Sequence, residues 1–166
     1  MGLGDVYKRQ PFCPSTCLYC SFTSYPLTAW KTQVDAYLDA LEKELDYVAA
    51  KNYHRKLNSI YIGGGTPTTL EPYQLDRLIR KIRCSFDLGD CLEFTVEAGR
   101  PDSITEEKLL VLRKNGISRI SINPQTMKQA TLDLIGRRHT VEDVKEKFLL
   151  ARELGFDNIN MDLIVG

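Results

Sequence analysis

The sequence predicts an α/β protein built on a parallel sheet, and two observations carry that prediction. Short apolar strands alternate with amphipathic helices, and the strand-helix units recur at intervals of roughly 30 to 40 residues, as in right-handed βαβ units. The chain has 166 residues, enough for about one domain, whereas a closed eight-fold barrel needs about 250. We therefore expect an open, curved partial barrel, with a doubly wound sheet as the alternative.

The elements follow one another with clear boundary signals. Thr32 and Asp35 open a first helix, whose apolar residues from Val34 to Val48 share one face. The expected order continues with a strand at 58–62, a glycine loop at 63–68, a helix through 75–82, a strand at 92–97, a helix opened by a Ser103 to Glu106 capping box and closed by Gly116, a strand at 117–123, a short helix at 128–135, a helix from Thr140 to Gly155, and a strand at 158–165.

The two ends of the chain fit this pattern less well. Residues 1–10 have no periodicity, and Lys8, Arg9 and Gln10 would make a poor central strand. We expect 1–10 to be a leader that does not look native. The core domain then spans 11–166, and we expect it to be a truncated fragment, incomplete at its C-terminal end.

Charge and hydropathy exclude several classes of function. Twenty-two basic residues balance 22 acidic ones, so the chain has no net positive charge that would attract it to nucleic acid. No apolar run approaches the roughly 20 residues of a membrane-spanning helix. Free cysteines suit a reducing compartment, and we expect a cytoplasmic protein.

Three cysteines, Cys13, Cys17 and Cys20, fall within eight residues. Thiols this close cannot all pair as disulfides without strain, but a short loop can wrap them around one soft metal centre. A structural zinc site usually takes four ligands, and Cys84 and Cys91 are interpreted as ordinary semi-buried cysteines. A four-iron four-sulfur cluster bound through three irons leaves its fourth iron open. We favour the cluster, and a non-catalytic zinc-binding module stays the alternative.

Three of the predicted strands alternate apolar and polar residues, whereas buried parallel strands are usually apolar throughout. If the apolar faces pack against helices, the polar faces line a common lumen whose C-terminal rim holds Glu97, Gln125 and Asp162. Amides and carboxylates in such a lumen suit a polar ligand. The glycine run 63–65 reaches the same rim, as either a ligand contact or a tight turn.

These motifs resemble a known family. The cysteine triplet, with Tyr19 before its last cysteine, resembles the signature of radical S-adenosylmethionine enzymes. The resemblance narrows to the oxygen-independent coproporphyrinogen III oxidase (coproporphyrinogen dehydrogenase) group, and most of all to its Gram-positive oxidase-like subgroup. The resemblance to the group rests on Pro-Phe-Cys before the triplet, Gly-Gly-Gly-Thr-Pro-Thr at 63–68, Val-Glu-Ala-Gly-Arg-Pro at 96–101, Ile-Asn-Pro-Gln-Thr at 122–126 and Met-Asp-Leu-Ile at 161–164. The resemblance to the subgroup rests on Ser-Phe-Thr-Ser-Tyr at 21–25 and Asn-Pro-Gln-Thr-Met at 123–127.

The resemblance implies a six-fold partial barrel, a 4Fe-4S cluster on the three cysteines, and bound S-adenosylmethionine. Gly65 and Thr66 match the place of a second S-adenosylmethionine, and Arg138 is an alternative to Arg137. His54 and His139 are interpreted as surface or capping residues. The residues expected to bind the cofactor are Tyr19, which would lie against the adenine, Gly64, Gly65, Thr66, Glu97, Gln125, Arg137 and Asp162.

The implied activity belongs to haem and porphyrin biosynthesis. With an electron from a reducing donor, a 5'-deoxyadenosyl radical would abstract hydrogen from a propionate, and loss of carbon dioxide and one electron would leave a vinyl group. Coproporphyrinogen III would give protoporphyrinogen IX. Because the cofactor carries the chemistry, no catalytic side chain is predicted. A haem chaperone and a radical methyltransferase of the same architecture stay open as alternatives.

Overall fold

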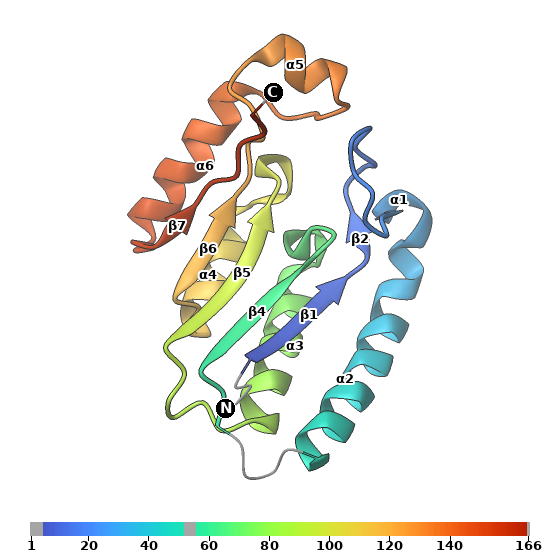
Figure 1. The fold of residues 1–166 in the computed structure, drawn as a ribbon, viewed down its shortest axis with the longest axis vertical. Coiled ribbons are helices and arrows are strands. Elements are labelled where there is room, and N and C mark those ends of the chain that lie inside the picture. Colours follow the sequence, from blue (N-terminus) through green and yellow to red (C-terminus); the bar gives the residue numbers. More distant parts are fainter. Residues whose placement is uncertain (1–4, 52–55, 166) are drawn as a thin grey trace.

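A parallel five-stranded sheet forms the centre of the molecule (Figure 1). The computed structural model describes residues 5–51 and 56–165. The strand order is β1-β4-β5-β6-β7, and β2 (Phe12–Cys13) pairs in parallel with β3 (Tyr25–Pro26) in a separate small sheet. The sheet strands are β1 (Asp5–Gln10), β4 (Ser59–Gly64), β5 (Glu93–Gly99), β6 (Arg119–Ile122) and β7 (Ile159–Asn160).

Helices connect the strands and lie on one face of this sheet and around its edges, while the other face stays open (Figure 1). They are α1 (Leu27–Trp30), α2 (Val34–Lys51), α3 (Pro72–Ser85), α4 (Glu106–Lys114), α5 (Gln129–Leu134) and α6 (Val141–Glu153), with short 3-10 turns η1 (Lys31–Gln33), η2 (Pro67–Thr69) and η3 (Pro101–Ser103). No helix in the described ranges is long and apolar enough to span a membrane.

The strand order decides between the two predicted architectures. A doubly wound sheet reverses its order at a switch point, but the order of the five strands in this sheet follows their order in the chain without a reversal. Successive right-handed crossovers in one direction place their helices on the same face. The prediction of a partial barrel is therefore confirmed, and the doubly wound alternative is wrong.

The apolar faces of β4, β5 and β6 pack against the helices; the alternation predicted this for β5 and β6, but failed for the last strand, where Met161 and Leu163 are exposed. Ile60, Val96 and Ile120 of three adjacent strands are almost fully buried, together with Leu45 of α2 and Leu78 of α3. Burial of a leucine or isoleucine side chain contributes roughly 1.5 to 3 kcal/mol. This apolar layer leaves the polar residues of the same strands on the opposite, lumenal face.

One segment outside the predicted strands forms a strand, and one predicted strand is shorter than expected. Residues 5–10 form β1, which pairs along its full length with β4; it lies at the edge of the sheet, where a polar sequence is tolerated better than in the centre. The strand expected at 158–165 is limited to Ile159–Asn160, followed by an isolated bridge between Gln125 and Leu163. Regular pairing of β7 with β6 is confined to Ile159 and Asn160.

Helix caps were predicted with mixed success. Thr140 and Asp143 form the expected capping box of α6. Thr32 lies inside η1, and α2 begins at Val34. The prediction of Ser103 as a cap is wrong, because Thr105 caps α4 and accepts a hydrogen bond from the Lys108 backbone N–H. The Ser103 hydroxyl donates instead to the buried carbonyl of Arg100.

Candidate functional site

The cysteine loop is attached to the C-terminal ends of β1 and β4. Gln10 is buried, and its side-chain amide both donates to the Phe12 carbonyl (2.8 Å) and accepts from the Phe12 N–H (2.7 Å). The Gly65 N–H donates to the Gln10 carbonyl at 2.6 Å and the Thr66 N–H to the Phe12 carbonyl at 2.8 Å. Backbone pairing therefore fixes Cys13 beside the glycine run.

Each glycine of the run is needed for a separate steric reason. A Cβ on Gly63 would lie 2.7 Å from Glu97 Oε2, and one on Gly65 would collide with the Phe12 carbonyl and lie 3.0 Å from Cys13 Sγ. Gly64 has a φ of 109°, which favours glycine. The sequence left a ligand contact and a tight turn open; the structure adds close packing against the cysteine loop and Glu97.

The predicted site residues come together in one place. The three cysteines and all eight predicted cofactor-binding residues line a single cavity of about 240 Å³. Cys13 and Cys17 are buried, and Cys20 is half-buried. A second cavity of about 540 Å³ shares Phe22, Gly64 and Glu97 with the first and is also lined by Tyr37 and Tyr61.

Arg137 joins the cysteine loop to the end of β6. Its guanidinium donates to the Tyr19 hydroxyl at 2.6 Å and to the Asn123 carbonyl at 3.3 Å, and it lies 5.9 Å from the centre of the Tyr19 ring. Burial raises the pKa of Tyr19, although the Arg137 charge opposes this shift. Tyr19 stays a neutral phenol at physiological pH.

Gln125 is the one residue other than glycine with a positive φ, 68°, among those described. Its N–H donates to the Asp162 carbonyl at 3.0 Å, and its own carbonyl accepts from the Ile164 N–H at 2.8 Å. Such left-handed conformations cost energy and cluster at functional sites. These two hydrogen bonds hold Gln125 and Asp162 together at the cavity.

Glu97 lies between the two cavities. Its carboxylate accepts from the Gly64 N–H at 3.2 Å, and the pairing of β5 with β6 is shifted between Glu97 and Gly99. Such bulges redirect side chains near active sites. Burial, a hydrogen bond to Glu97 and the charge of that carboxylate raise the pKa of Tyr61 well above its usual value.

Two polar residues that reach the cavity from the ends of β5 and β6 had no predicted role. Arg100 and Asn123 both contribute to the smaller cavity. Arg100 belongs to the Val-Glu-Ala-Gly-Arg-Pro motif and Asn123 precedes Pro124, so the signal was present without a role being assigned. Burial opposes the charge of Arg100, but hydrogen bonding to Asp102 and the nearby Cys17 and Cys13 leave its pKa raised.

The interpretation of His139 as a surface or capping residue is wrong, because its side chain is fully buried. Burial and the charge of Arg137 lower its pKa, so it is neutral at physiological pH. His54 lies outside the described residues, and Arg138 does not line either cavity described above.

Several buried polar atoms at the cavity fit a bound polar ligand. Asn123 Oδ1 and Arg137 Nε are buried and have no hydrogen-bond partner in the protein, although buried polar groups are usually satisfied. No group of three or more His, Cys, Asp or Glu side chains in the described part of the chain is arranged to hold one metal ion. A mononuclear zinc site requires its thiolates at about 2.3 Å from one ion, whereas each thiolate of a cluster binds a different iron.

Comparison with known proteins identifies the family to which this chain belongs. The family model of the radical SAM superfamily matches residues 7–166. The oxygen-independent coproporphyrinogen-III oxidase-like protein HemZ of Bacillus subtilis is 47% identical over 165 residues, which cover 98% of this chain and 33% of that protein. The heme chaperone HemW of Bacillus subtilis is 43% identical over 98% of this chain and 42% of that protein.

A solved structure agrees in fold. Coproporphyrinogen III oxidase (HemN) from Escherichia coli, described as a radical SAM enzyme, superimposes with a TM-score of 0.87 at 32% identity, over 96% of this chain and 36% of that chain. The chain thus spans between a third and about two fifths of the length of these relatives. Its fold, motifs and relatives agree, and the chain belongs to the radical SAM superfamily, within the coproporphyrinogen oxidase-like group.

Proposed function

We propose that this chain is the core of a radical SAM enzyme that oxidatively decarboxylates the propionates of coproporphyrinogen III to vinyl groups, giving protoporphyrinogen IX. The observation that carries the proposal is the convergence of eleven predicted residues, the three cysteines among them, on one cavity. The protein would work in the reducing cytoplasm with an electron donor and a tetrapyrrole substrate as partners.

Cys13, Cys17 and Cys20 would hold a 4Fe-4S cluster, since thiolates are the ligands such clusters take. The bound cluster and S-adenosylmethionine would together supply the electron transfer and radical chemistry of the reaction. The loop pairing at Gly65 and Thr66 fixes the first cysteine. The remaining work of these residues is to position the cofactor and exclude water.

Side chains around the cavity supply the contacts that the cofactor requires. The carboxylates of Glu97 and Asp162 would accept hydrogen bonds from its amino and hydroxyl groups. The side-chain amide of Gln125 would either donate or accept a hydrogen bond. Arg137 has a buried Nε without a protein partner, which would donate to a cofactor oxygen. Tyr19 would lie along the adenine, held by Arg137.

The neighbouring cavity supports binding of a substrate beside the cofactor. It has a volume of about 540 Å³ and shares Gly64 and Glu97 with the smaller one. A ligand there would lie next to a ligand in the smaller cavity. Aromatic walls from Phe22, Tyr37 and Tyr61 suit the flat pyrrole rings of a tetrapyrrole.

The experiment is anaerobic reconstitution of the full-length protein, followed by iron and sulfide analysis and by turnover with reductant, S-adenosylmethionine and coproporphyrinogen III. We expect iron and sulfide near the stoichiometry of one cluster, and a vinyl product detected by mass spectrometry. Stoichiometric zinc without sulfide would favour the non-catalytic zinc module. Deoxyadenosine without vinyl product would contradict the oxidase activity.

A haem chaperone is the second candidate, because the HemW relative is 43% identical to this chain. The two functions differ in what they do to the tetrapyrrole. A chaperone would bind haem stoichiometrically and transfer it unchanged, whereas an oxidase would convert coproporphyrinogen III. Haem titration followed by visible absorbance, run beside the turnover assay, separates them.

A further inference from the structure

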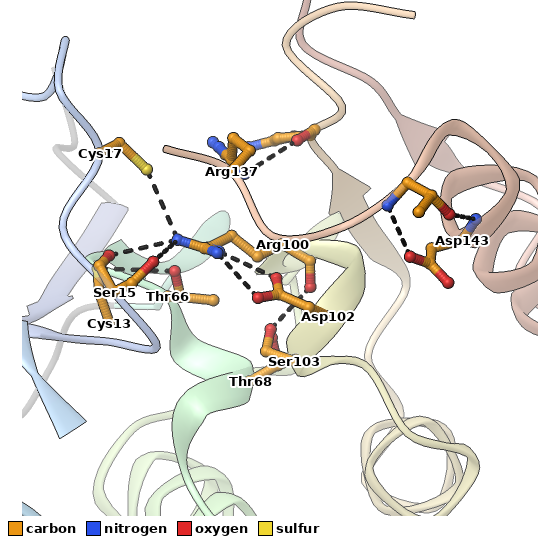
Figure 2. A network of polar contacts seen from close by, with 12 residues as sticks. Cys13, Ser15, Cys17, Thr66, Thr68, Arg100, Asp102, Ser103, Arg137 and Asp143 are labelled. Atoms are coloured by element: carbon orange, nitrogen blue, oxygen red, sulfur yellow. Dashed lines mark hydrogen bonds and ion pairs between the residues drawn. The ribbon is translucent and has the colours of Figure 1, made fainter. Parts of the chain in front are cut away.

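Arg100 is the most deeply buried charged group at the cysteine loop. It follows β5 directly after Gly99, whose φ of 63° turns the chain at the rim. Its side chain is 3% exposed. Figure 2 shows its guanidinium between the cysteine loop on one side and Asp102 on the other.

The guanidinium has two separate sets of partners. Nε and Nη2 donate to the two carboxylate oxygens of Asp102, at 2.9 and 2.8 Å. Nη1 donates to the loop, to Ser15 Oγ at 2.8 Å, to the Ser15 carbonyl at 3.3 Å and to Cys17 Sγ at 3.6 Å. The bidentate pair fixes the plane of the guanidinium, and that plane directs Nη1 at the cysteine loop (Figure 2).

Burial of the Arg100 charge would lower the stability of the fold with no compensating function if Arg100 only held the cysteine loop in place. The guanidinium is removed from water while the Asp102 side chain stays 22% exposed, and a neutral side chain in place of a buried charge is often at least as stable. Serine hydroxyl and carbonyl groups can be held by neutral donors. A permanent positive charge next to a cysteine sulfur has a different consequence, because hydrogen bonds to the sulfurs and local charge set the reduction potential of an iron-sulfur cluster.

We propose that Arg100 is a positioning residue that orients Cys17 and raises the reduction potential of the cluster bound there. The inference rests on the cluster of the proposed function. Reduction adds one negative charge to the cluster, so a nearby cation stabilises the reduced form more than the oxidised one. Asp102 has the opposite charge and moderates the effect, while holding the donor in place.

The test uses Arg100→Gln, which keeps an N–H donor but removes the charge, and Arg100→Lys, which keeps the charge but loses the fork. Each full-length variant is reconstituted anaerobically, its iron and sulfide are measured, and the cluster is titrated with dithionite while the reduced signal is followed by electron paramagnetic resonance. The readout is the midpoint potential, which a purely structural contact would not move in a charge-dependent way.

We expect Arg100→Gln to hold iron like the wild type but to titrate at a more negative potential. At the wild-type midpoint its ratio of reduced to oxidised cluster would fall about tenfold, which for one electron is about 59 mV. Arg100→Lys would stay nearer the wild type. An Arg100→Gln protein with full iron content and an unchanged midpoint would overturn the proposal.

A third variant covers the case in which Arg100→Gln fails to take up iron. Asp102→Asn removes the counter-charge and keeps one oxygen that can accept from the guanidinium, so the midpoint should shift to a less negative value. A shift in the opposite direction, or none, refutes a charge effect. A wild-type protein that takes up no iron would instead contradict the cluster assignment, and the two failures are thus distinguishable by iron analysis alone.

Discussion

The C-terminal rim of the sheet and the outer helical layer, α2 and α3, use charge in opposite ways. In the outer helical layer the charges remain partly in solvent, where Arg77 pairs with Asp39 and Glu42 while leucines below it are buried. At the rim, Arg100 and Arg137 are only 3% and 8% exposed. Surface ion pairs contribute little stability, and buried charges cost stability unless well paired.

This difference indicates a division of roles. The outer helical layer supplies the free energy of folding through apolar burial, and the rim holds polar atoms that the protein itself does not satisfy, such as Asn123 Oδ1. If the division holds, substitutions at the rim change ligand binding with little effect on stability. Substitutions in the outer helical layer should do the reverse.

The largest effect is expected at the rim, for Cys17→Ser. Loss of one of three thiolates should abolish stoichiometric iron uptake after reconstitution, since a hydroxyl is a much poorer ligand for iron-sulfur clusters. The unfolding midpoint of the protein without cluster should change little. Iron analysis and thermal unfolding by circular dichroism measure the two quantities.

Cys84→Ser is the matched control, because Cys84 is an exposed thiol on α3. It should keep the wild-type iron content. If Cys17→Ser and Cys84→Ser bind the same amount of iron, whether at the wild-type level or below it, the result would argue against a specific site on the cysteine loop.

The second effect is expected in the outer helical layer, for Leu45→Ala. Leu45 is fully buried between α2 and the sheet, and the cavity left by truncation should lower the free energy of unfolding by about 2 to 5 kcal/mol. Urea unfolding measures it. Tyr47→Ala, on the exposed side of the same helix, should cost far less.

If the comparison is right, Leu45→Ala still takes up the wild-type amount of iron per folded chain. A variant that is stable but lacks iron would break the division between the two regions.

A smaller effect is expected at the capping box of α6, for Thr140→Ala. The Thr140 hydroxyl accepts from the Asp143 N–H at 3.1 Å, and loss of such a cap should cost about 0.5 to 2 kcal/mol at pH 7. Chemical unfolding of both proteins at that pH measures the difference.

The same box predicts a pH dependence. Hydrogen bonds from Thr140, the backbone N–H first, lower the pKa of Asp143. A depressed carboxyl pKa stabilises the fold above the ordinary aspartate value of about 3.9, and the contribution is lost as the pH falls through the depressed value. Asp143→Asn should therefore lose stability at pH 7 and converge on the wild type in acid. A constant difference across this range would contradict the capping role.

The smallest effect is expected for Lys81→Ala in the outer helical layer. Lys81 Nζ lies 2.6 Å from Asp46 Oδ1, whose side chain is 63% exposed. Exposed pairs contribute about 0.2 to 1 kcal/mol, so the stability loss should fall in this range and shrink in high salt. A larger loss of stability that does not depend on salt would contradict the interpretation of this contact as a solvent-exposed ion pair.

Sequence patterns were most informative where local chemistry is strong. The alternation of Leu92 to Glu97 predicted that Phe94 and Val96 of β5 are buried, because side chains in a strand alternate by geometry, but Leu92 precedes the strand and is exposed. The capping box at Thr140 was readable for the same reason. Local patterns failed at Ser103, where a nearby threonine was the better cap and the hydroxyl was needed by a buried carbonyl.

Local sequence did not predict which terminal segments form strands. A polar stretch such as 5–10 becomes a strand because β4 offers a full register of partners. The segment after Asn160 reads as a strand but pairs only through isolated contacts with Gln125. Strand formation in both cases depends on a neighbour distant in sequence, and that information is not in the segment itself.

By itself, the sequence determined the class of fold, the family and eleven of the residues that line the cavity, because motifs, spacing and periodicity are local properties of the chain. Only the tertiary structure decided how these residues face one another. It brought Arg100 to Cys17, 83 positions away, and Arg137 to Tyr19, 118 positions away. Such pairings follow from the order of strands in the sheet, which adds contacts that no local pattern encodes.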